Sequence, residues 1–260
     1  MMEKGLVAAF QVALTVLLPS PGHAVDNCPP FVQDNSASEI IARHMPQSGP
    51  LSVPQLNELF KELVREKVIP PLSVRPSSGP APLTVEIGWL IAPMGDPAEI
   101  EFDVDGDGNP EWSQKVFRLE SERREHTYRQ EGEYQFTVRI HDRSGKITVY
   151  AIPVTVLSPS EFHAEIKARW SGFKAALHHG DVSAALECIA VSSRDRYRPV
   201  LQKLGGNLPS ISTNLGDLHV TRVKDGLAEA TTVRLQDGQR RLYFIYFMPD
   251  PDGIWRIQTF

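Results

Sequence analysis

Gly132-Glu133-Tyr134-Gln135-Phe136-Thr137-Val138-Arg139-Ile140 is the stretch that decides the fold of the middle of the chain. Apolar and polar residues alternate through it, which is the pattern of a half-buried β-strand. Similar runs surround it, at Leu83–Ile87, Ile100–Phe102 and Ile147–Val156. Turn signals separate these runs at Ser78-Gly79-Pro80, Gly106 to Pro110 and Arg143-Ser144-Gly145. The spacing predicts a small β-sandwich over residues 72–157.

Three motifs of this region resemble the PKD (polycystic kidney disease) domain. They are Arg75 to Val85, then Phe102-Asp103-Val104-Asp105-Gly106-Asp107-Gly108, and then His126-Thr127-Tyr128 followed by Gly132 to Val138. The resemblance implies an all-β, seven-stranded immunoglobulin-like sandwich that serves extracellular proteins as a spacer or binding module, without enzyme activity. The sequence departs from the family at Phe102, where a tryptophan is usual, and in a charged stretch from Arg118 to Arg129.

A different pattern begins after Leu157. Ser158-Pro159-Ser160-Glu161 has the cap, the first-turn proline and the third-position glutamate of a helix start. Two further helices are predicted, one capped by Asp181 and one near Arg194 to Leu204 that stops at Gly205-Gly206. Four strands separated by tight-turn sequences then form an antiparallel meander, at Leu218–Val223, Leu227–Leu235, Arg241–Met248 and Ile254–Phe260.

This order resembles the nuclear transport factor two-like superfamily. The residues that carry the resemblance are Trp170 to Leu177, Gly180 to Leu186 and the closing Asp252-Gly253-Ile254-Trp255-Arg256-Ile257. It implies an α+β cone over residues 158–260, with three helices on a curved antiparallel sheet. Some members use the pocket of the cone for isomerase or dehydratase chemistry, and many use it only for binding or dimerisation.

The N-terminal residues have the features of a secretory signal. Lys4 precedes an apolar run from Gly5 to Leu18, which is too short to span a bilayer comfortably and ends in Gly22-His23-Ala24. We expect cleavage after Ala24, and an exported product in the periplasm or the medium; an uncleaved membrane anchor is the alternative. Residues 25–71 are expected to form a proline-rich linker with one helix, over Val53–Lys67.

Composition narrows the function classes. The 260 residues are 41% hydrophobic, enough for two domains, and the net charge of −5 argues against nucleic acid and anionic membranes as general partners. Two cysteines, Cys28 and Cys188, are too few for a disulfide scaffold. Two isolated thiols are the simpler interpretation, and one long-range bridge is the alternative.

No catalytic signature is present in the sequence. His178, His179 and Asp181 fall at a helix end, where solvated caps are the ordinary explanation. Tyr243 and Tyr246 fall on opposite faces of one strand, so one of them points inward and is expected to belong to the core. A zinc site that also includes His163 lacks suitable ligand spacing.

The sharpest local feature is Asp103-x-Asp105-x-Asp107-Gly108-Asn109-x-Glu111. Its alternating oxygen ligands around a glycine turn are typical of a calcium loop, although Gln114 at the twelfth position excludes an EF-hand. No lysine or arginine lies between these residues in the sequence. We predict a calcium site with ligands from Asp103, Asp105, Asp107, Asn109 and Glu111; the alternative is a turn whose carboxylates bond nearby amides.

Together these features predict an exported, non-catalytic binding or spacer protein that recognises a surface polysaccharide or protein. The two-module chain has no expected membrane span after signal cleavage, and its C-terminal sheet is a candidate homodimer surface. The rival hypothesis is a small-molecule isomerase or dehydratase that uses a pocket in the C-terminal domain. An interior filled by apolar side chains would count against that rival.

Overall fold

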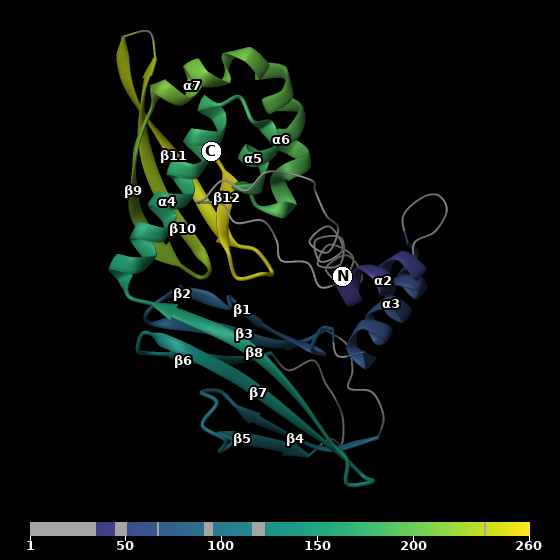
Figure 1. The fold of residues 1–260 in the computed structure, drawn as a ribbon. Helices are drawn as coiled ribbons and strands as arrows, with labels where there is room; N and C mark the ends of the chain where they lie inside the picture. The colour runs from purple at the N-terminus through teal and green to yellow at the C-terminus, as the bar shows by residue number, and fades with distance from the viewer. Residues whose placement is uncertain (1–34, 45–50, 67, 91–95, 116–122, 237) are drawn as a thin grey trace. The chain divides into compact units, whose positions relative to one another are not determined.

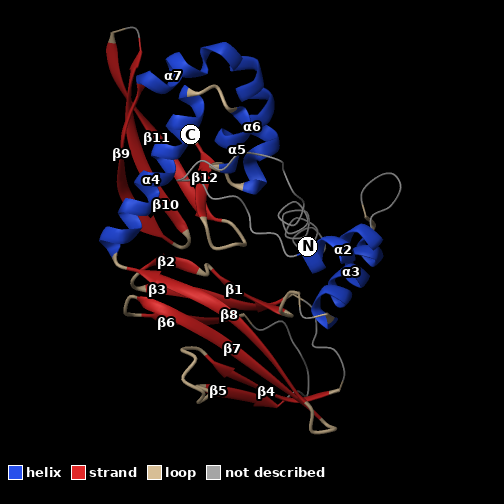
Figure 2. Ribbon diagram, in the orientation of Figure 1, coloured by secondary structure: helices blue, strands red, loops and turns tan. Residues whose placement is uncertain are grey.

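The structure is a computed structural model that describes residues 35–44, 51–66, 68–90, 96–115, 123–236 and 238–260. It is rich in β-strand, with several separate sheets and fewer helices (Figures 1 and 2). The described residues form two compact units: 35–77 with 81–156, and 78–80 with 157–260. The predicted signal peptide, residues 1–24, and Cys28 lie outside the described residues.

Two helices open the first unit, α2 (Asn35–His44) and α3 (Val53–Arg65). Helix α3 begins at Val53, as predicted, and its N-cap is Ser52, whose N–H donates to the Gln55 side chain at 2.9 Å. The expectation of a single helix in 25–71 is wrong. The second one, α2, is held to α3 by the Arg43–Glu62 ion pair at 2.9 Å and by a contact of 3.2 Å between the His44 ring and the Glu62 carboxylate.

Two sheets share the core of the first unit. One has the order β1 (Leu72–Arg75), β3 (Leu83–Trp89), β6 (Arg124–Tyr128); the other contains, in order, β8 (Ile147–Leu157), β7 (Gly132–Asp142), β4 (Pro97–Asp103) and β5 (Trp112–Lys115). All of these pairings are antiparallel. The alternating residues predicted to point inward are buried, among them Val85, Ile87, Ile100, Phe102, Phe136 and Val138. The short strand β2 (Ser78–Pro80) groups with the second unit.

The second unit starts with α4 (Pro159–His178), as the capping motif predicts. The Ser158 hydroxyl accepts the Glu161 N–H at 3.2 Å, while the Glu161 carboxylate accepts the Ser158 N–H at 2.9 Å. Helices α5 (Val182–Glu187) and α6 (Val191–Leu204) follow. The expectation of three helices is wrong by one. After a 3₁₀ turn, η1 (Gly205–Asn207), the chain forms α7 (Leu208–Asn214), whose first turn contains Pro209.

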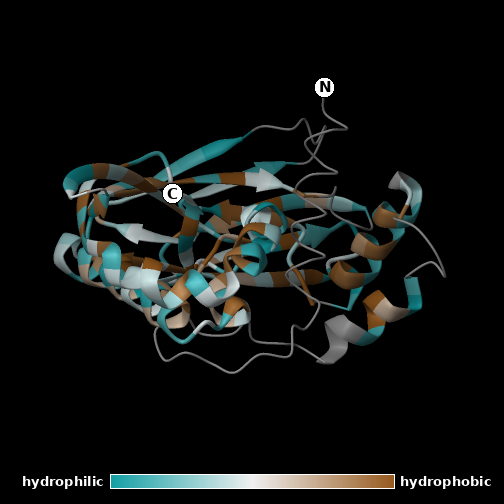
Figure 3. Cartoon of the chain, turned by 90° about the horizontal axis from the view of Figure 1, so that it is seen from above, coloured by the Kyte–Doolittle hydropathy of each residue, from teal (hydrophilic) through white to brown (hydrophobic). Residues whose placement is uncertain are grey.

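An antiparallel meander completes this unit, in the order β12 (Trp255–Thr259), β11 (Gln239–Pro249), β10 (Leu227–Gln236), β9 (Leu215–Lys224). The helices lie on one face of this sheet (Figure 2). Hydrophobic and hydrophilic residues are interspersed along the helices and strands (Figure 3). One face of α4 is buried, with Phe162, Ile166, Trp170, Phe173 and Leu177 in the core. The opposite face of the sheet carries exposed apolar side chains, including Leu242 and Phe244.

Candidate functional site

The predicted calcium loop connects β4 to β5. Carboxylate oxygens of Asp103, Asp105 and Glu111 lie within 4.8 Å of one another, so this group could hold a metal ion. Gly106 allows the turn: its φ is +79°, and a Cβ at this position would lie 2.9 Å from the Gln135 carbonyl oxygen. The loop therefore brings three of the five predicted ligands together.

Asp103 is the buried centre of this loop. Its carboxylate accepts the N–H of Gly106 at 2.7 Å and that of Gly108 at 3.0 Å. It also pairs with the Arg139 guanidinium of β7 at 3.1 Å. Arg139 therefore supplies a positive charge to the loop. The sequence between the carboxylates contains no lysine or arginine, but β7 pairs with β4 and supplies Arg139 from 36 residues downstream.

The other carboxylates also bond the backbone. Glu111 accepts the Val104 N–H at 2.7 Å, and Asp105 accepts the Asp107 N–H at 3.1 Å. Asp107 accepts the Asn109 backbone N–H at 2.7 Å and its side-chain amide at 3.2 Å, and these bonds lower the pKa of the Asp107 carboxyl. The group of described carboxylates that could share an ion does not include Asp107. The amide-bonded turn is therefore formed, and each oxygen retains further lone pairs.

Two aromatic residues of β6 stand beside the loop. The buried Tyr128 hydroxyl donates to the Val104 carbonyl at 2.7 Å, which ties the loop to the other sheet. The His126 ring lies 4.6 Å from the Tyr128 ring. Burial lowers the pKa of His126, while the carboxylates of Glu111 and Asp105 act in the opposite direction. His126 is therefore predominantly neutral near pH 7.

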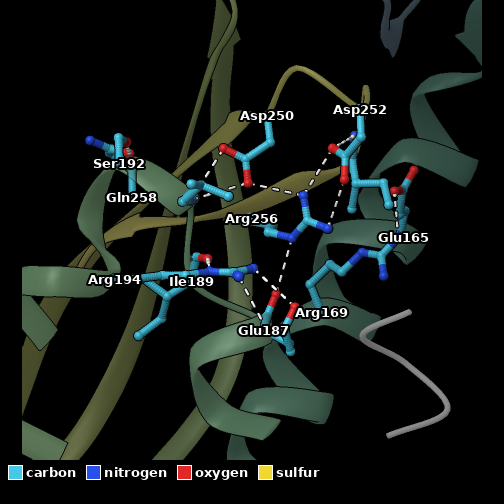
Figure 4. A network of polar contacts seen from close by, with 12 residues as sticks. Glu165, Arg169, Glu187, Ile189, Ser192, Arg194, Asp250, Asp252, Arg256 and Gln258 are labelled. Carbon is cyan, nitrogen blue, oxygen red and sulfur yellow. Dashed lines mark hydrogen bonds and ion pairs between the residues drawn. The ribbon is translucent and has the colours of Figure 1, made fainter. Parts of the chain in front are cut away.

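A separate polar network lies in the second unit, around the fully buried Arg256 (Figure 4). The Arg256 guanidinium donates to the Glu187 carbonyl at 3.0 Å, to Asp250 at 2.9 Å and to Asp252 at 2.9 Å. Its second terminal nitrogen lies 2.9 Å from the other Asp252 oxygen. Asp250 also accepts the Val191 N–H at the start of α6, at 3.2 Å. The turn between β11 and β12 is thereby fastened to both α5 and α6.

The same network includes a second arginine. Arg194 of α6 forms two hydrogen bonds with the Glu187 carboxylate, at 3.2 and 3.1 Å, and one with the Ile189 carbonyl. Burial lowers the pKa of Arg194 and raises the pKa of Asp250, and for Asp250 the nearby Arg256 opposes the effect of burial only in part. The partners in this network are residues of α5, α6 and the β11–β12 turn, so the network holds these elements together.

The residues considered for catalysis are dispersed. Asp181 caps α5, accepting the Ala184 N–H at 2.9 Å, as the ordinary explanation predicts. His178 and His179 are exposed at the end of α4, and the His178 ring nitrogen is 3.4 Å from the Ser212 hydroxyl, which donates to the Pro209 carbonyl. Tyr243 is half-buried and donates to the Gln236 side chain at 2.8 Å. His163 is exposed on the first part of α4, and Tyr246 is half-buried on β11.

Large side chains fill the space between the helices and the sheet of the second unit. The Trp170 indole donates to the Gly216 carbonyl at 3.0 Å, and its ring lies 5.7 Å from that of Phe173. Phe173 in turn packs against Phe260. The core continues through residues of α5, α7 and all four strands, among them Leu186, Leu208, Leu218, Ala230, Ile245, Phe247, Trp255 and Ile257.

Cys188, at the end of α5, is fully buried and disulfide-bonded. The interpretation of two isolated thiols is therefore wrong for Cys188. The only sequence signal for this bond is that the chain has two cysteines, Cys28 and Cys188. They are 160 positions apart, and such a separation does not indicate that they lie close together.

Comparison of the chain with protein-family models and with curated proteins finds no match in either set. Within the residues that the structure describes, no helix has the length and apolar character needed to cross a membrane.

Proposed function

We propose that this chain is an exported, non-catalytic binding or spacer protein that recognises a polysaccharide or protein at a cell surface. The observation that carries the proposal is the packed interior of the second unit. Trp170, Phe173 and Ile245 are buried in the core between the helices and the sheet, where the resemblance to a cone-shaped fold implies a pocket. Asp181 caps α5 and Tyr243 donates to the Gln236 side chain, which favours binding over isomerase or dehydratase chemistry.

Export is supported by cysteine chemistry as well as by the expected signal. Disulfides persist in oxidising compartments and are rare where cellular thiols are kept reduced. A disulfide-bonded Cys188 within the core suits the periplasm or the extracellular medium. Fractionation of cells that express the full chain, with thiol labelling of the recovered protein under denaturing conditions, tests both parts: retention in the cytoplasm with a free Cys188 would contradict export.

The outer face of the second unit's sheet is the surface through which we propose association with a second copy. Leu242, Phe244 and Met248 alternate along β11, and Leu235 of β10 is diagonal to Leu242. Their exposed fractions are 59%, 50%, 39% and 56% respectively. A contiguous apolar stripe of this kind on a soluble protein marks an interaction surface.

Recognition is tested by affinity electrophoresis of residues 25–260 through gels that contain different cell-surface polysaccharides. Retardation by one polysaccharide but not by a neutral dextran supports the proposal. Steady turnover of a small carbonyl substrate that is abolished by Tyr243→Phe would support the enzyme alternative, because Tyr243 is the half-buried inward tyrosine of that sheet.

We propose calcium as an accessory ligand of the β4–β5 loop. Support comes from the convergence of Asp103, Asp105 and Glu111, while the existing amide bonds and Arg139 imply that the loop folds without the ion and binds it weakly. At ten times its dissociation constant, calcium would stabilise the first unit by about 1.4 kcal/mol.

Thermal unfolding in calcium, with magnesium as the comparison ion, measures this effect. Asp105→Asn removes an exposed ligand and should abolish the calcium-dependent rise in melting temperature. Asp142→Asn is the matched control, since Asp142 also accepts turn amides, from Ser144 and Lys146, but lies outside the cluster. An unchanged melting temperature in calcium would leave the loop as an amide-bonded turn only.

A further inference from the structure

Two arginines face each other at the end of the β10–β11 hairpin that lies farthest from the β11–β12 turn (Figure 1). Arg234 of β10 and Arg241 of β11 are direct partners in the antiparallel register. Side chains that are directly opposite point to the same face of the sheet, and their Cβ atoms lie about 5 Å apart. Two guanidinium groups are therefore attached side by side.

This pairing is electrostatically unfavourable as it stands, because like charges directly opposite each other destabilise a strand pair. Within the described part of the chain, neither arginine forms an ion pair with a carboxylate. The Arg234 Nε–H is buried and has no hydrogen-bond partner among those residues. A buried donor without an acceptor lowers the stability of the folded state. A bound group that supplies an acceptor at this position would remove that cost.

The described surroundings of the pair are polar, and none of the described carboxylates pairs with either arginine. The face that carries Ile245 and Tyr243 along β11 continues through Arg241, so the apolar core gives way to polar groups toward the hairpin end. Tyr243 is engaged by Gln236 at 2.8 Å. A third cation, Lys174 of α4, lies 3.5 Å from the Gly216 carbonyl, next to the residue of β9 that pairs with Arg234.

Asp217 is the acidic residue of this part of β9, but it is exposed and forms no ion pair with either arginine. Arg240, the neighbour of Arg241, is exposed on the opposite face, where it is the partner of Leu235. The accumulation of positive charge on the inner face thus belongs to Arg234, Arg241 and Lys174. It is not a general property of the hairpin.

We propose that Arg234 and Arg241 form a binding site for a compact anionic group, a sulfate, phosphate or carboxylate. A guanidinium offers parallel N–H donors that match two oxygens of such a group. An anion between the two side chains converts their repulsion into two attractive contacts and supplies an acceptor for the unpaired Arg234 Nε–H. Two sources offer such a group, a free anion and the acidic substituent of a polysaccharide; the second source rests on the binding function proposed above.

Thermal unfolding of residues 25–260 in sodium sulfate, at constant ionic strength maintained with sodium chloride, tests the site. At ten times its dissociation constant, sulfate should raise the melting temperature of the second unit by about 3–6 °C. Arg241→Ala should abolish that rise. Because it also removes a like-charge pair, Arg241→Ala should leave the melting temperature without sulfate unchanged or slightly higher.

Arg240→Ala is the matched control, since it removes the same charge from the adjacent position on the other face and should preserve the full response to sulfate. The proposal is overturned if wild type responds no more to sulfate than to chloride, if Arg241→Ala retains the response, or if Arg240→Ala loses as much of it.

Galacturonate oligomers and neutral galactose oligomers then distinguish the source of the anion. Binding of the acidic oligomer alone, lost in Arg241→Ala, assigns the site to an acidic polysaccharide. A response to sulfate without any binding of the acidic oligomer supports the anion site while counting against uronate polysaccharides as the partner. The response to sulfate therefore tests the anion site, and the binding of the acidic oligomer tests whether a polysaccharide is the partner.

Discussion

Replacement of Arg256 by methionine should strongly destabilise the second unit. Methionine keeps much of the apolar stem but removes the contacts to Asp250, Asp252 and the Glu187 carbonyl. The two carboxylates would then remain in a protein interior, where Asp250 is only 8% exposed. Removal of one partner from a buried ion pair costs about 3–5 kcal/mol. For a unit of this size, the melting temperature should fall by more than about 10 °C.

The loss should depend on pH in a definite direction. Burial already raises the pKa of Asp250, and Arg256 offsets part of that rise; without Arg256 the folded-state pKa becomes higher still. Between the unfolded value of about 3.9 and this raised value, the folded state binds a proton that the unfolded chain has released. Stability of the variant then falls as pH rises through that window. The deficit relative to wild type should be smaller at pH 5 than at pH 8.

Chemical denaturation at both pH values, followed by tryptophan fluorescence, measures the loss. Adding Asp250→Asn and Asp252→Asn to the Arg256→Met variant should recover most of the stability, because neutral amides are less costly to bury. Arg222→Met, at an exposed position of β9, serves as the control for the substitution itself. A cost below about 1 kcal/mol that is equal at the two pH values would refute the reasoning.

Three further outcomes are expected. In denaturant unfolding, Trp170→Ala should lower the free energy of unfolding by about 3–5 kcal/mol. Trp170→Phe should lower it by only about 1–2 kcal/mol, because the Gly216 carbonyl still accepts the Thr232 hydroxyl. A loss below about 1 kcal/mol for the alanine variant would mean that this face of α4 is not part of the core. Phe244→Ser should lower self-association in light scattering without lowering the melting temperature, while Val200→Ser on α6 should not; equal self-association of wild type and Phe244→Ser would exclude the sheet face as the dimer surface. A fragment of residues 158–260 should fold alone, and an unstructured circular dichroism spectrum would contradict that independence.

The predictions that succeeded depend on local sequence. The cap at Ser158 requires only Glu161 three residues later, so the start of α4 is legible without any tertiary information. The strands around Phe136 and Ile245 follow from alternation alone. The sequence analysis does not predict helix α7, because Gly205-Gly206 indicates the end of helical structure, although Leu208-Pro209 carries its own start signal.

The candidate calcium site was predicted only in part, because some of its contacts depend on strand pairing. The spacing of Asp103, Asp105 and Glu111 brought three carboxylates together as predicted, but Arg139 neutralises Asp103 across a strand pairing that spacing cannot reveal. The pairing of Arg234 with Arg241 could not be predicted either, because this pairing depends on the register of the β10–β11 hairpin.

The Arg256 network was missed for a different reason. Asp250 and Asp252 lie in the tight turn between the last two predicted strands, where the Asp250 N–H donates to the Ile254 carbonyl at 2.9 Å. The available signal was Arg256 itself, a charged residue inside the apolar run Ile254-Trp255-Arg256-Ile257. A charge at such a position is seldom buried without partners, so it indicates that acids lie nearby.

The position of Arg256 also sets the order of events during synthesis. Helices α4 to α6 leave the ribosome long before β12, and until then Glu187, Asp250 and the apolar face around Phe162 lack Arg256 and Trp255. The second unit therefore cannot reach its stable arrangement while the chain is still growing toward residue 256. A nascent chain paused before that point would present the uncovered apolar surface around Phe162, which makes it a substrate for chaperones and proteases.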